Sequence, residues 1–435
     1  MTHRGNDVRA RVGLAIALLF NLAGAAVAET PRETFQRLIN AGLQAEKAGD
    51  FKGAEAEFAK ADAITPNYPP LMMERARAAA RGHDADAAIA LLSRYADAGL
   101  KADAAYLGPD LQALADDPRF KPVRERLDRN AAPVGHPLPA ASLGDGPFLA
   151  ENVAWDQARN RFLVSSVWRH TIVAVDEAGA ASPYLQPGAP DWSIFNLGVD
   201  ARRGVLWASA SASGPGGPEG DKTSVALLEI DLASGRVMER FSPPIGGARQ
   251  RSFGDLVVTR DGTVYVSDSL AGEVWRLKPG AQGLDRLVAP GVMDSPQGLV
   301  PTPDGRRLIV SDYPGGLFSV EIATGRVERL PAPKEASLIW LDGMVGDGTG
   351  GIIAVQSTSR PERVLRLTLD RDWRRVTGWT VLAANLPELR GPTGGIVRGR
   401  EFVFVARSQW DDFDDDGKPK TDKPEPALIE RLPLG

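Results

Sequence analysis

The stretch SPQGLVPTPDGRRLIVSD at residues 295–312 repeats the pattern of SFGDLVVTRDGTVYVSD at residues 252–268. Each copy has an apolar run, an Asp-Gly turn and a second apolar run that ends in Ser-Asp. Two alternating apolar runs joined by Asp-Gly are typical of a β-hairpin. The chain therefore builds the same hairpin at least twice.

Four other stretches follow this pattern less closely. They are ENVAWDQARNRFLVSS, FNLGVDARRGVLWAS, LDGMVGDGTGGIIAVQS and PTGGIVRGREFVFVAR. Counted back from the turn, the residues that open the six copies are Glu151, Asn196, Gly254, Gln297, Asp342 and Thr393. They recur about every 45 residues, which is the period of a propeller blade. The repeat predicts an all-β, six-bladed β-propeller over residues 148–435.

The last copy is followed by too little chain for a complete blade. Three strand-like runs remain, the last of them near residues 427–433. The fourth, outer strand of this blade is expected from residues before Glu151, within 135–146. Closing the ring with both parts of the chain hides an open sheet edge.

Residues 29–130 are rich in Ala, Glu and Arg at helical spacing. The residues that match the spacing of a tetratricopeptide repeat are Ala54, Phe58, Ala61 and Pro66. Gly42, on the preceding helix, leaves room for Phe58. The stretch predicts a small all-α, tetratricopeptide-like domain, which either docks a protein partner or serves as a helical cap or spacer. The Pro- and Gly-rich residues 131–147 are predicted to be the linker.

Composition and the first residues narrow the class of protein. The chain has no Cys and a net charge of −5, so thiol chemistry is excluded and nucleic-acid binding is disfavoured. Arg4, Arg9 and Arg11 precede an apolar run that ends in an A-x-A site. Residues 1–28 are therefore predicted to be a signal peptide, with an uncleaved anchor as the alternative. We expect export, to a bacterial periplasm, and no membrane span after cleavage.

In a propeller the innermost strand of each blade lines the central channel, so the residues that open the six copies rim one mouth. Glu151, Asn196, Gln297 and Asp342 would then bring two carboxylates and two amides to one axis. Such oxygen ligands suit Ca²⁺, or another divalent metal, better than Zn²⁺. The alternative is a polar, water-filled channel.

Other candidate residues lie in turns that open on the same face. Trp168, Tyr313 and Trp410 are expected to contact a small, uncharged and moderately apolar substrate. His170 is a candidate proton shuttle, because an imidazole can take up and release protons near neutral pH, or else an ordinary turn residue. Asp412, Asp414 and Asp416 match the first half of an EF-hand loop, but Lys423 replaces its closing Glu. This loop is predicted to be either a second calcium loop or a solvated acidic loop.

The motifs ENVAWD at 151, PQGL at 296 and LDGM at 341 resemble the senescence marker protein/gluconolactonase (regucalcin-like) family and, more distantly, the paraoxonases. In that family a Glu, an Asn and an Asp that open the first, fourth and fifth blades hold a metal. The resemblance implies these roles for Glu151, Gln297 and Asp342. Gly254 stands where the family has a third-blade Asn. The neighbouring Asp255 would need a β-bulge to take over, since it points to the other face of an ideal strand.

The resemblance implies lactone or ester hydrolysis, with Asp342 as metal ligand and base. We therefore predict an exported, calcium-dependent, lactonase-like or esterase-like hydrolase of a small molecule. The alternative is a non-catalytic binding or scaffold propeller with a helical partner-docking module.

Overall fold

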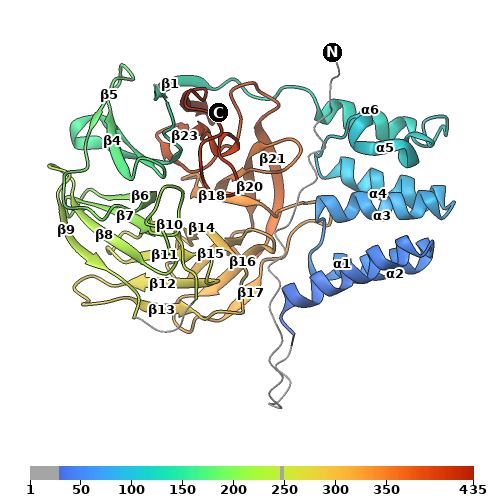
Figure 1. Cartoon of the computed structure of the whole chain (residues 1–435), viewed down its shortest axis with the longest axis horizontal. Helices are drawn as coiled ribbons and strands as arrows, with labels where there is room; N and C mark the ends of the chain where they lie inside the picture. Colours follow the sequence, from blue (N-terminus) through green and yellow to red (C-terminus); the bar gives the residue numbers. More distant parts are fainter. Residues whose placement is uncertain (1–28, 145, 245–248) are drawn as a thin grey trace.

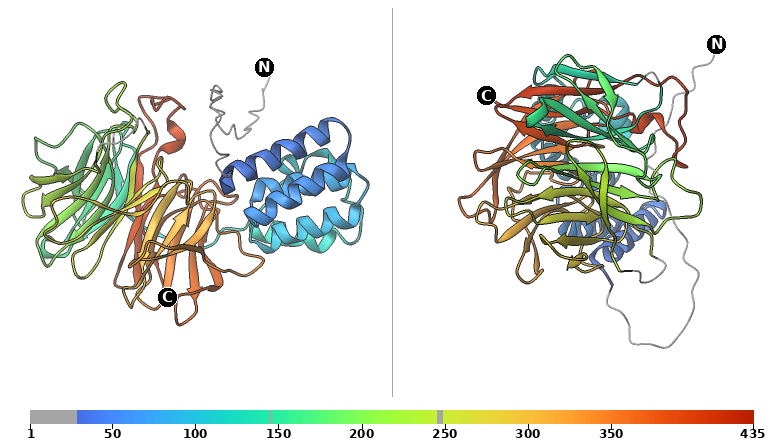
Figure 2. Two further views of the ribbon diagram at one scale, coloured as in Figure 1. Left: turned by 90° about the horizontal axis from the view of Figure 1, so that it is seen from below. Right: turned by 90° about the vertical axis from the view of Figure 1, so that its left-hand side faces the viewer.

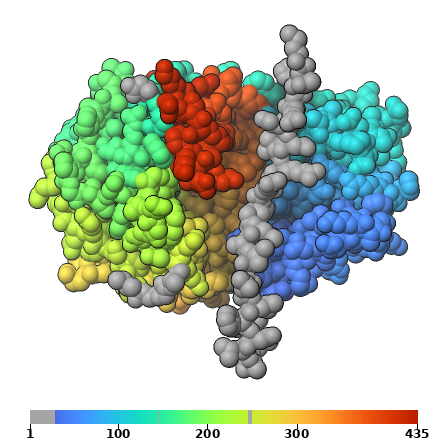
Figure 3. Space-filling view, viewed as in Figure 1, coloured from blue at the N-terminus to red at the C-terminus, as the bar shows by residue number. Residues whose placement is uncertain are grey.

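The computed structural model describes residues 29–144, 146–244 and 249–435. A helical region lies at one side of a β-propeller (Figure 1, Figure 2), and the two form adjoining lobes of the surface (Figure 3). The predicted signal peptide, residues 1–28, lies outside the described residues. No helix in the described ranges is long and apolar enough to cross a membrane.

Six helices make up the helical region of the described chain. They are α1 (Pro31–Lys47), α2 (Phe51–Ile64), α3 (Pro69–Arg81), α4 (Ala85–Asp97), α5 (Ala104–Gln112) and α6 (Lys121–Asn130). Side-chain caps explain several starts: Thr30 and Glu33 form a capping box on α1, and Asp50 caps α2. A Cβ on Gly42 would lie 2.2 Å from the Phe58 ring, so this glycine does make room for the aromatic side chain between α1 and α2.

The propeller has six four-stranded antiparallel sheets, as predicted. Blades one to three contain β2 (Ala150–Asp156), β3 (Arg161–Ser166), β4 (Thr171–Val175) and β5 (Ala181–Pro183); β6 (Ser193–Asp200), β7 (Val205–Ser211), β8 (Val225–Asp231) and β9 (Val237–Phe241); and β10 (Phe253–Val258), β11 (Val264–Asp268), β12 (Glu273–Leu277) and β13 (Asp285–Val288). Blades four and five contain β14 (Pro296–Pro301), β15 (Arg307–Asp312), β16 (Gly316–Glu321) and β17 (Val327–Arg329); and β18 (Leu341–Gly346), β19 (Gly351–Gln356), β20 (Arg363–Leu369) and β21 (Val376–Ala384).

Blade six joins two distant parts of the chain, which confirms the predicted closure. Its strands are β22 (Gly395–Arg398), β23 (Glu401–Arg407), β24 (Ala427–Pro433) and β1 (Leu138–Leu143). The outer strand β1 pairs antiparallel with β24. Part of the predicted linker is therefore a blade strand. The innermost strands contact one another in a closed ring, in the order β2, β6, β10, β14, β18 and β22.

The helical region is joined to blades four and five by buried polar contacts. The guanidinium group of Arg363, which is 1% exposed, donates to the main-chain oxygens of Ala98 and Gly99, at 3.0 Å each. The side chain of Asn67 donates to the main-chain oxygens of Lys334 and Ala336. These buried groups are hydrogen-bonded to one another instead of to water, and this fixes the position of the helical region on the propeller.

Candidate functional site

The innermost strands of blades one to five share one irregularity near their start. In each, the pairing with the next strand shifts by one residue, which is a β-bulge. A bulge re-aims the side chains that it contains. The bulged pairs are Glu151-Asn152, Phe195-Asn196, Gly254-Asp255, Gln297-Gly298 and Asp342-Gly343. They contain all the site residues predicted on the inner strands.

The bulge brings both Gly254 and Asp255 to the same cavity. In blade two, Phe195 takes the place equivalent to Gly254, and Asn196 the place equivalent to Asp255. Counting back from the turn, as in the sequence analysis, matched Asn196 with Gly254 and was therefore one residue off. The reason is that β6 forms one more residue pair with β7 between the bulge and the turn than β10 forms with β11. Nδ2 of Asn196 donates to Oδ1 of Asp255 at 2.5 Å.

Glycines in the bulges let the innermost strands approach one another around the axis. A Cβ on Gly343 would lie 2.6 Å from Cα of Gly394, on the next blade. A Cβ on Gly298 would lie 2.6 Å from the main-chain oxygen of Asp342. No side chain fits in either place. The glycine of the LDGM motif therefore serves packing, and the Asp before it reaches the cavity.

The bulges surround a cavity of about 290 Å³ at the channel mouth. We call it the acidic cavity. Its acidic residues are Glu151, Asp255, Asp342, Glu362 and Asp411. Gln297, Asn196, Tyr313 and Trp410 also line it, as predicted from their places in the repeat. Among the described residues that form its lining there is no Lys, Arg or His.

The three carboxyl groups on the inner strands have pKa values above the usual range of their side chains. Withdrawal from bulk water raises the pKa of Asp342 to about 8, and the nearby Asp255 adds to this. Burial raises the pKa of Asp255 to about 6, against the hydrogen bond from Asn196. Burial and the charge of Asp342 raise the pKa of Glu151 well above its usual range. Each acid is destabilised in its charged form because no cation compensates it.

Hydrogen bonds hold part of the rim. Nε1 of Trp410 donates to Oε2 of Glu151 at 2.6 Å, and Oγ1 of Thr393 donates to the main-chain oxygen of Glu151 at 2.6 Å. The hydroxyl of Tyr313 lies 2.7 Å from Oγ1 of Thr358. By contrast, Asp342 accepts no hydrogen bond from the described residues. Its oxygens are available to a ligand.

Gln297 and Gly254 complement each other. An ideal Cβ on Gly254 would lie 3.3 Å from Oε1 of Gln297, which is closer than an ordinary contact. The longer Gln297 side chain thus occupies space that a side chain on Gly254 would need. Nε2 of Gln297 donates to Oγ of Ser295 at 3.1 Å.

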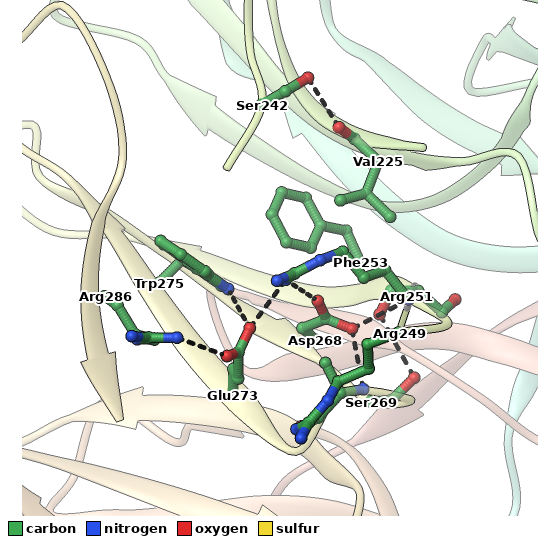
Figure 4. A network of polar contacts seen from close by, with 12 residues as sticks. Val225, Ser242, Arg249, Arg251, Phe253, Asp268, Ser269, Glu273, Trp275 and Arg286 are labelled. Carbon is green, nitrogen blue, oxygen red and sulfur yellow. Dashed lines mark hydrogen bonds and ion pairs between the residues drawn. The ribbon is translucent and has the colours of Figure 1, made fainter. Parts of the chain in front are cut away.

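A network of ion pairs supports the approach to β10 (Figure 4). Nη1 of Arg251 lies 2.8 Å from Oδ2 of Asp268 and 2.7 Å from Oε2 of Glu273. Arg286 pairs with the other oxygen of Glu273 at 3.0 Å. Oδ1 of Asp268 accepts from the main-chain nitrogen of Ser252, which lines the acidic cavity. This network positions the start of the strand that carries Asp255.

The structure does not bring His170 or Trp168 to the acidic cavity. Nδ1 of His170 lies 2.6 Å from Oδ1 of Asp191, and its Nε2 lies 3.2 Å from the main-chain oxygen of Pro215. Trp168 packs against Phe413, with ring centroids 5.3 Å apart. Both side chains contact neighbouring loops instead of the cavity. Their positions in a turn of the sequence did not predict these contacts.

The predicted second calcium loop forms a different structure. Asp414 accepts from the main-chain nitrogens of Asp416 and Lys418, which makes a tight turn. Asp412 pairs with Arg390 at 3.2 Å. The carboxylates of Asp412 and Asp414 thus serve different partners, Asp416 contributes its main-chain nitrogen, and no metal-ready group of acids stands among the described residues. Trp410 and Asp411, just before this turn, line the acidic cavity instead.

Like Asp411, Glu362 is an acid of the cavity that the sequence analysis missed. Glu362 lies in the turn between β19 and β20, and its Oε2 accepts from the main-chain nitrogen of Gly391 at 3.0 Å. Burial raises its pKa. The signal that could have revealed Glu362 was an acidic residue at the end of a turn on the face of the predicted mouth.

The donor set fits a hard divalent cation in its chemistry. The cavity offers carboxylate, amide and hydroxyl oxygens, and its negative charge has no partner. Within the described ranges, no three His, Cys, Asp or Glu side chains already stand at the spacing of a metal site. The side chains whose oxygen atoms best suit such a cation are those of Glu151, Asp255 and Asp342, together with the amide oxygen of Gln297.

Solved structures with the same fold include a gluconolactonase from Xanthomonas campestris (20% identity, 70% of this chain and 99% of that chain, TM-score 0.46). A luciferin-regenerating enzyme matches at 12% identity over 68% of this chain and 95% of that chain, with a TM-score of 0.50. A calcium-binding protein, regucalcin, from Agrobacterium tumefaciens matches at 17% identity over 67% and 92%, with a TM-score of 0.46. No protein-family model and no curated protein matches the chain. At these identities the similarity shows the fold alone.

Proposed function

We propose that the protein is a divalent-metal-dependent hydrolase of a small lactone or ester, and that the metal is calcium. One observation carries the proposal: Glu151, Asp255 and Asp342 converge on one cavity whose described lining has no basic side chain. Carboxylates in such a place repel one another unless a cation neutralises them. The distant structural likeness to gluconolactonase-type propellers is consistent with this chemistry.

A bound divalent cation would polarise a carbonyl oxygen and lower the pKa of a water molecule. The chain itself supplies the remaining functions. Trp410 orients Glu151, and Asn196 orients Asp255. Asp342 holds a proton at neutral pH in the absence of a cation, and a cation beside it would free it to act as a base. Tyr313 presents its ring and hydroxyl to the substrate.

The test is a calcium titration by calorimetry, followed by a screen of lactones and aryl esters with and without a chelator. We expect saturable binding and hydrolysis that the chelator abolishes. Asp342→Asn should abolish hydrolysis and weaken calcium binding at least about tenfold, since it removes a ligand charge and the base. The control is Asp414→Ala, which alters the acidic turn. Equal calcium binding by wild type and a Glu151→Gln/Asp342→Asn variant would overturn the proposal.

A non-catalytic binding propeller is the second candidate. The absence of a preassembled metal cluster among the described residues favours it, and partner docking by the helical region would belong to it. Calcium binding without hydrolysis of any lactone or ester would select this alternative. Export remains a proposal from residues 1–28 alone. N-terminal sequencing of protein from cell fractions tests it, and an intact Met1 in the cytosol would contradict it.

A further inference from the structure

A second cavity, of about 600 Å³, lies between the helical region and the loops of blades three and four. We call it the aromatic cavity. α1 contributes Phe35, and the connection between α2 and α3 contributes Tyr68. The propeller contributes Val292, Tyr313 and Phe318. Its walls thus come from two parts of the chain that are far apart in sequence.

The wall of this cavity is apolar and well supported. The rings of Phe35 and Tyr68 lie 5.4 Å apart, and those of Tyr68 and Trp340 lie 5.3 Å apart, both edge to face. Such aromatic pairs hold each other in place. Val292 is 47% exposed, although a large aliphatic side chain gains from burial. The cavity therefore offers apolar surface that a ligand would cover.

The charges of the lining favour an uncharged ligand. Asp312 accepts from the main-chain nitrogen of Ser295, and Arg329 donates to the main-chain oxygen of Ile64. These two charged groups are used within the protein. Arg32 and Asp294, the other charged residues of the described lining, are of opposite sign. The lining thus selects neither an anion nor a cation.

The aromatic cavity adjoins the acidic cavity. Tyr313 lines both of them, and its hydroxyl is held by Ser357 and Thr358. Ser295 of the aromatic cavity is hydrogen-bonded to Gln297 of the acidic cavity. At about 290 Å³, the acidic cavity lies at the lower end of the range for ligand pockets. A substrate larger than a small polar group would need space beyond the acidic cavity.

We propose that the two cavities form one extended ligand site. The reacting group of the substrate enters the acidic cavity, and an apolar alkyl or aryl substituent of the same molecule occupies the aromatic cavity. The substrate class is then an uncharged ester or lactone with an apolar substituent. Phe35 and Tyr68 make the helical region a specificity-determining wall. This inference rests on the proposed hydrolase function for the identity of the reacting group.

The test uses p-nitrophenyl acetate and p-nitrophenyl hexanoate, which differ in their apolar part. Wild type should prefer the hexanoate in kcat/KM. Phe35→Ala should reduce this preference about tenfold by removing apolar contact. The control, Leu43→Ala, removes a different apolar side chain of α1 that is exposed and does not line the cavity, and it should leave the preference unchanged. If Phe35→Ala fails to fold, Val292→Asp replaces it with the same expectation.

A binding measurement separates this inference from the proposed function. Calorimetry with N-phenylhexanamide, an uncharged amide, needs no hydrolysis. We expect Phe35→Ala, but not Leu43→Ala, to weaken its binding about tenfold. If no ester is hydrolysed but amide binding depends on Phe35, the hydrolase proposal falls and the ligand site stands. The inference is overturned if Phe35→Ala changes neither property. It is also overturned if an active enzyme keeps its ester preference while amide binding weakens.

Discussion

Blade three contains two buried carboxylates in opposite surroundings. Asp268 is fully buried and receives an ion pair from Arg251 and hydrogen bonds from two main-chain nitrogens. Asp255 is 9% exposed, and its carboxylate accepts a hydrogen bond from the neutral amide of Asn196. Burial raises the pKa of both acids, but in the first arrangement an ion pair and main-chain hydrogen bonds oppose this effect, whereas in the second only a neutral amide does.

The same contrast distinguishes the whole ion-pair network of blade three from the whole acidic cavity. In the blade three network, Glu273 lies between Arg251 and Arg286, and Trp275 donates to it as well. In the acidic cavity, burial raises the cost of ionising each acid, Asp342 adds to that cost for Glu151, and Asp255 adds to it for Asp342. Burial of an acid therefore does not mark a site by itself. The missing counter-charge does, and the following experiments test that distinction.

Arg251→Met should have the largest effect on stability. It leaves Asp268 and Glu273 buried without their shared cation, and breaking a buried pair in this way costs about 3–5 kcal/mol. Urea unfolding measures the loss. The control is Arg326→Met, whose side chain is 67% exposed and pairs with Glu328. It should cost less than about 1 kcal/mol. Similar losses for the two variants would remove the contrast.

Arg363→Met should have the next largest effect. Arg363 is a buried cation that is satisfied by main-chain oxygens of the helical region and by Oε1 of Gln356 rather than by a carboxylate. The substitution leaves these acceptors unpaired, so we expect a loss of about 2 kcal/mol in the free energy of unfolding. Limited proteolysis should also cut the connection near Ala131 faster. Unchanged stability and cleavage would show that the helical region is independent of this contact with the propeller.

The pH dependence of stability should reveal the uncompensated acids. Without metal, the folded protein keeps protons on Glu151, Asp255 and Asp342 to a higher pH than the unfolded chain, whose carboxyl groups titrate near pH 4. The free energy of unfolding should therefore fall as pH rises from about 4 to 8, by up to about 1.4 kcal/mol per pH unit for each proton retained.

Urea unfolding across this pH range, in a chelator and in calcium, measures the effect. Calcium should reduce the slope, because it favours the charged forms of the carboxylates. Subtracting the curve of the Glu151→Gln/Asp342→Asn variant isolates the cavity from other titrating groups. Parallel curves for this variant and wild type would contradict the assignment of the slope to the cavity.

Asp342→Asn should have the smallest effect on stability, and its sign is the informative part. Removing one of several repelling charges should raise the free energy of unfolding of the metal-free protein at pH 8 by about 1 kcal/mol. Asp268→Asn, in the compensated network, should lower it. Urea unfolding of both variants in a chelator makes the comparison, and a loss of stability in both would mean that Asp342 is a structural acid.

Local patterns in the sequence were sufficient for much of this molecule. The Asp-Gly hairpins and their spacing predicted six blades, and the lack of a last strand predicted that β1 completes blade six. The phase of the repeat also placed Glu151, Gln297 and Asp342 at one mouth, and the turns placed Tyr313 and Trp410 beside them. These features follow from strand periodicity and propeller symmetry, which act over short stretches of chain.

Other features depend on contacts that the sequence does not encode locally. The phase of Asn196 depends on how far one hairpin pairs, and the partners of His170 depend on how loops fold against blade two. The position of the helical region depends on Arg363, which donates hydrogen bonds to Ala98 and Gly99, more than 260 residues away in the sequence. Sequence alone thus determined the ring and most of its acidic rim. Only the tertiary structure decided which charges find a partner, because a partner is chosen by proximity in space.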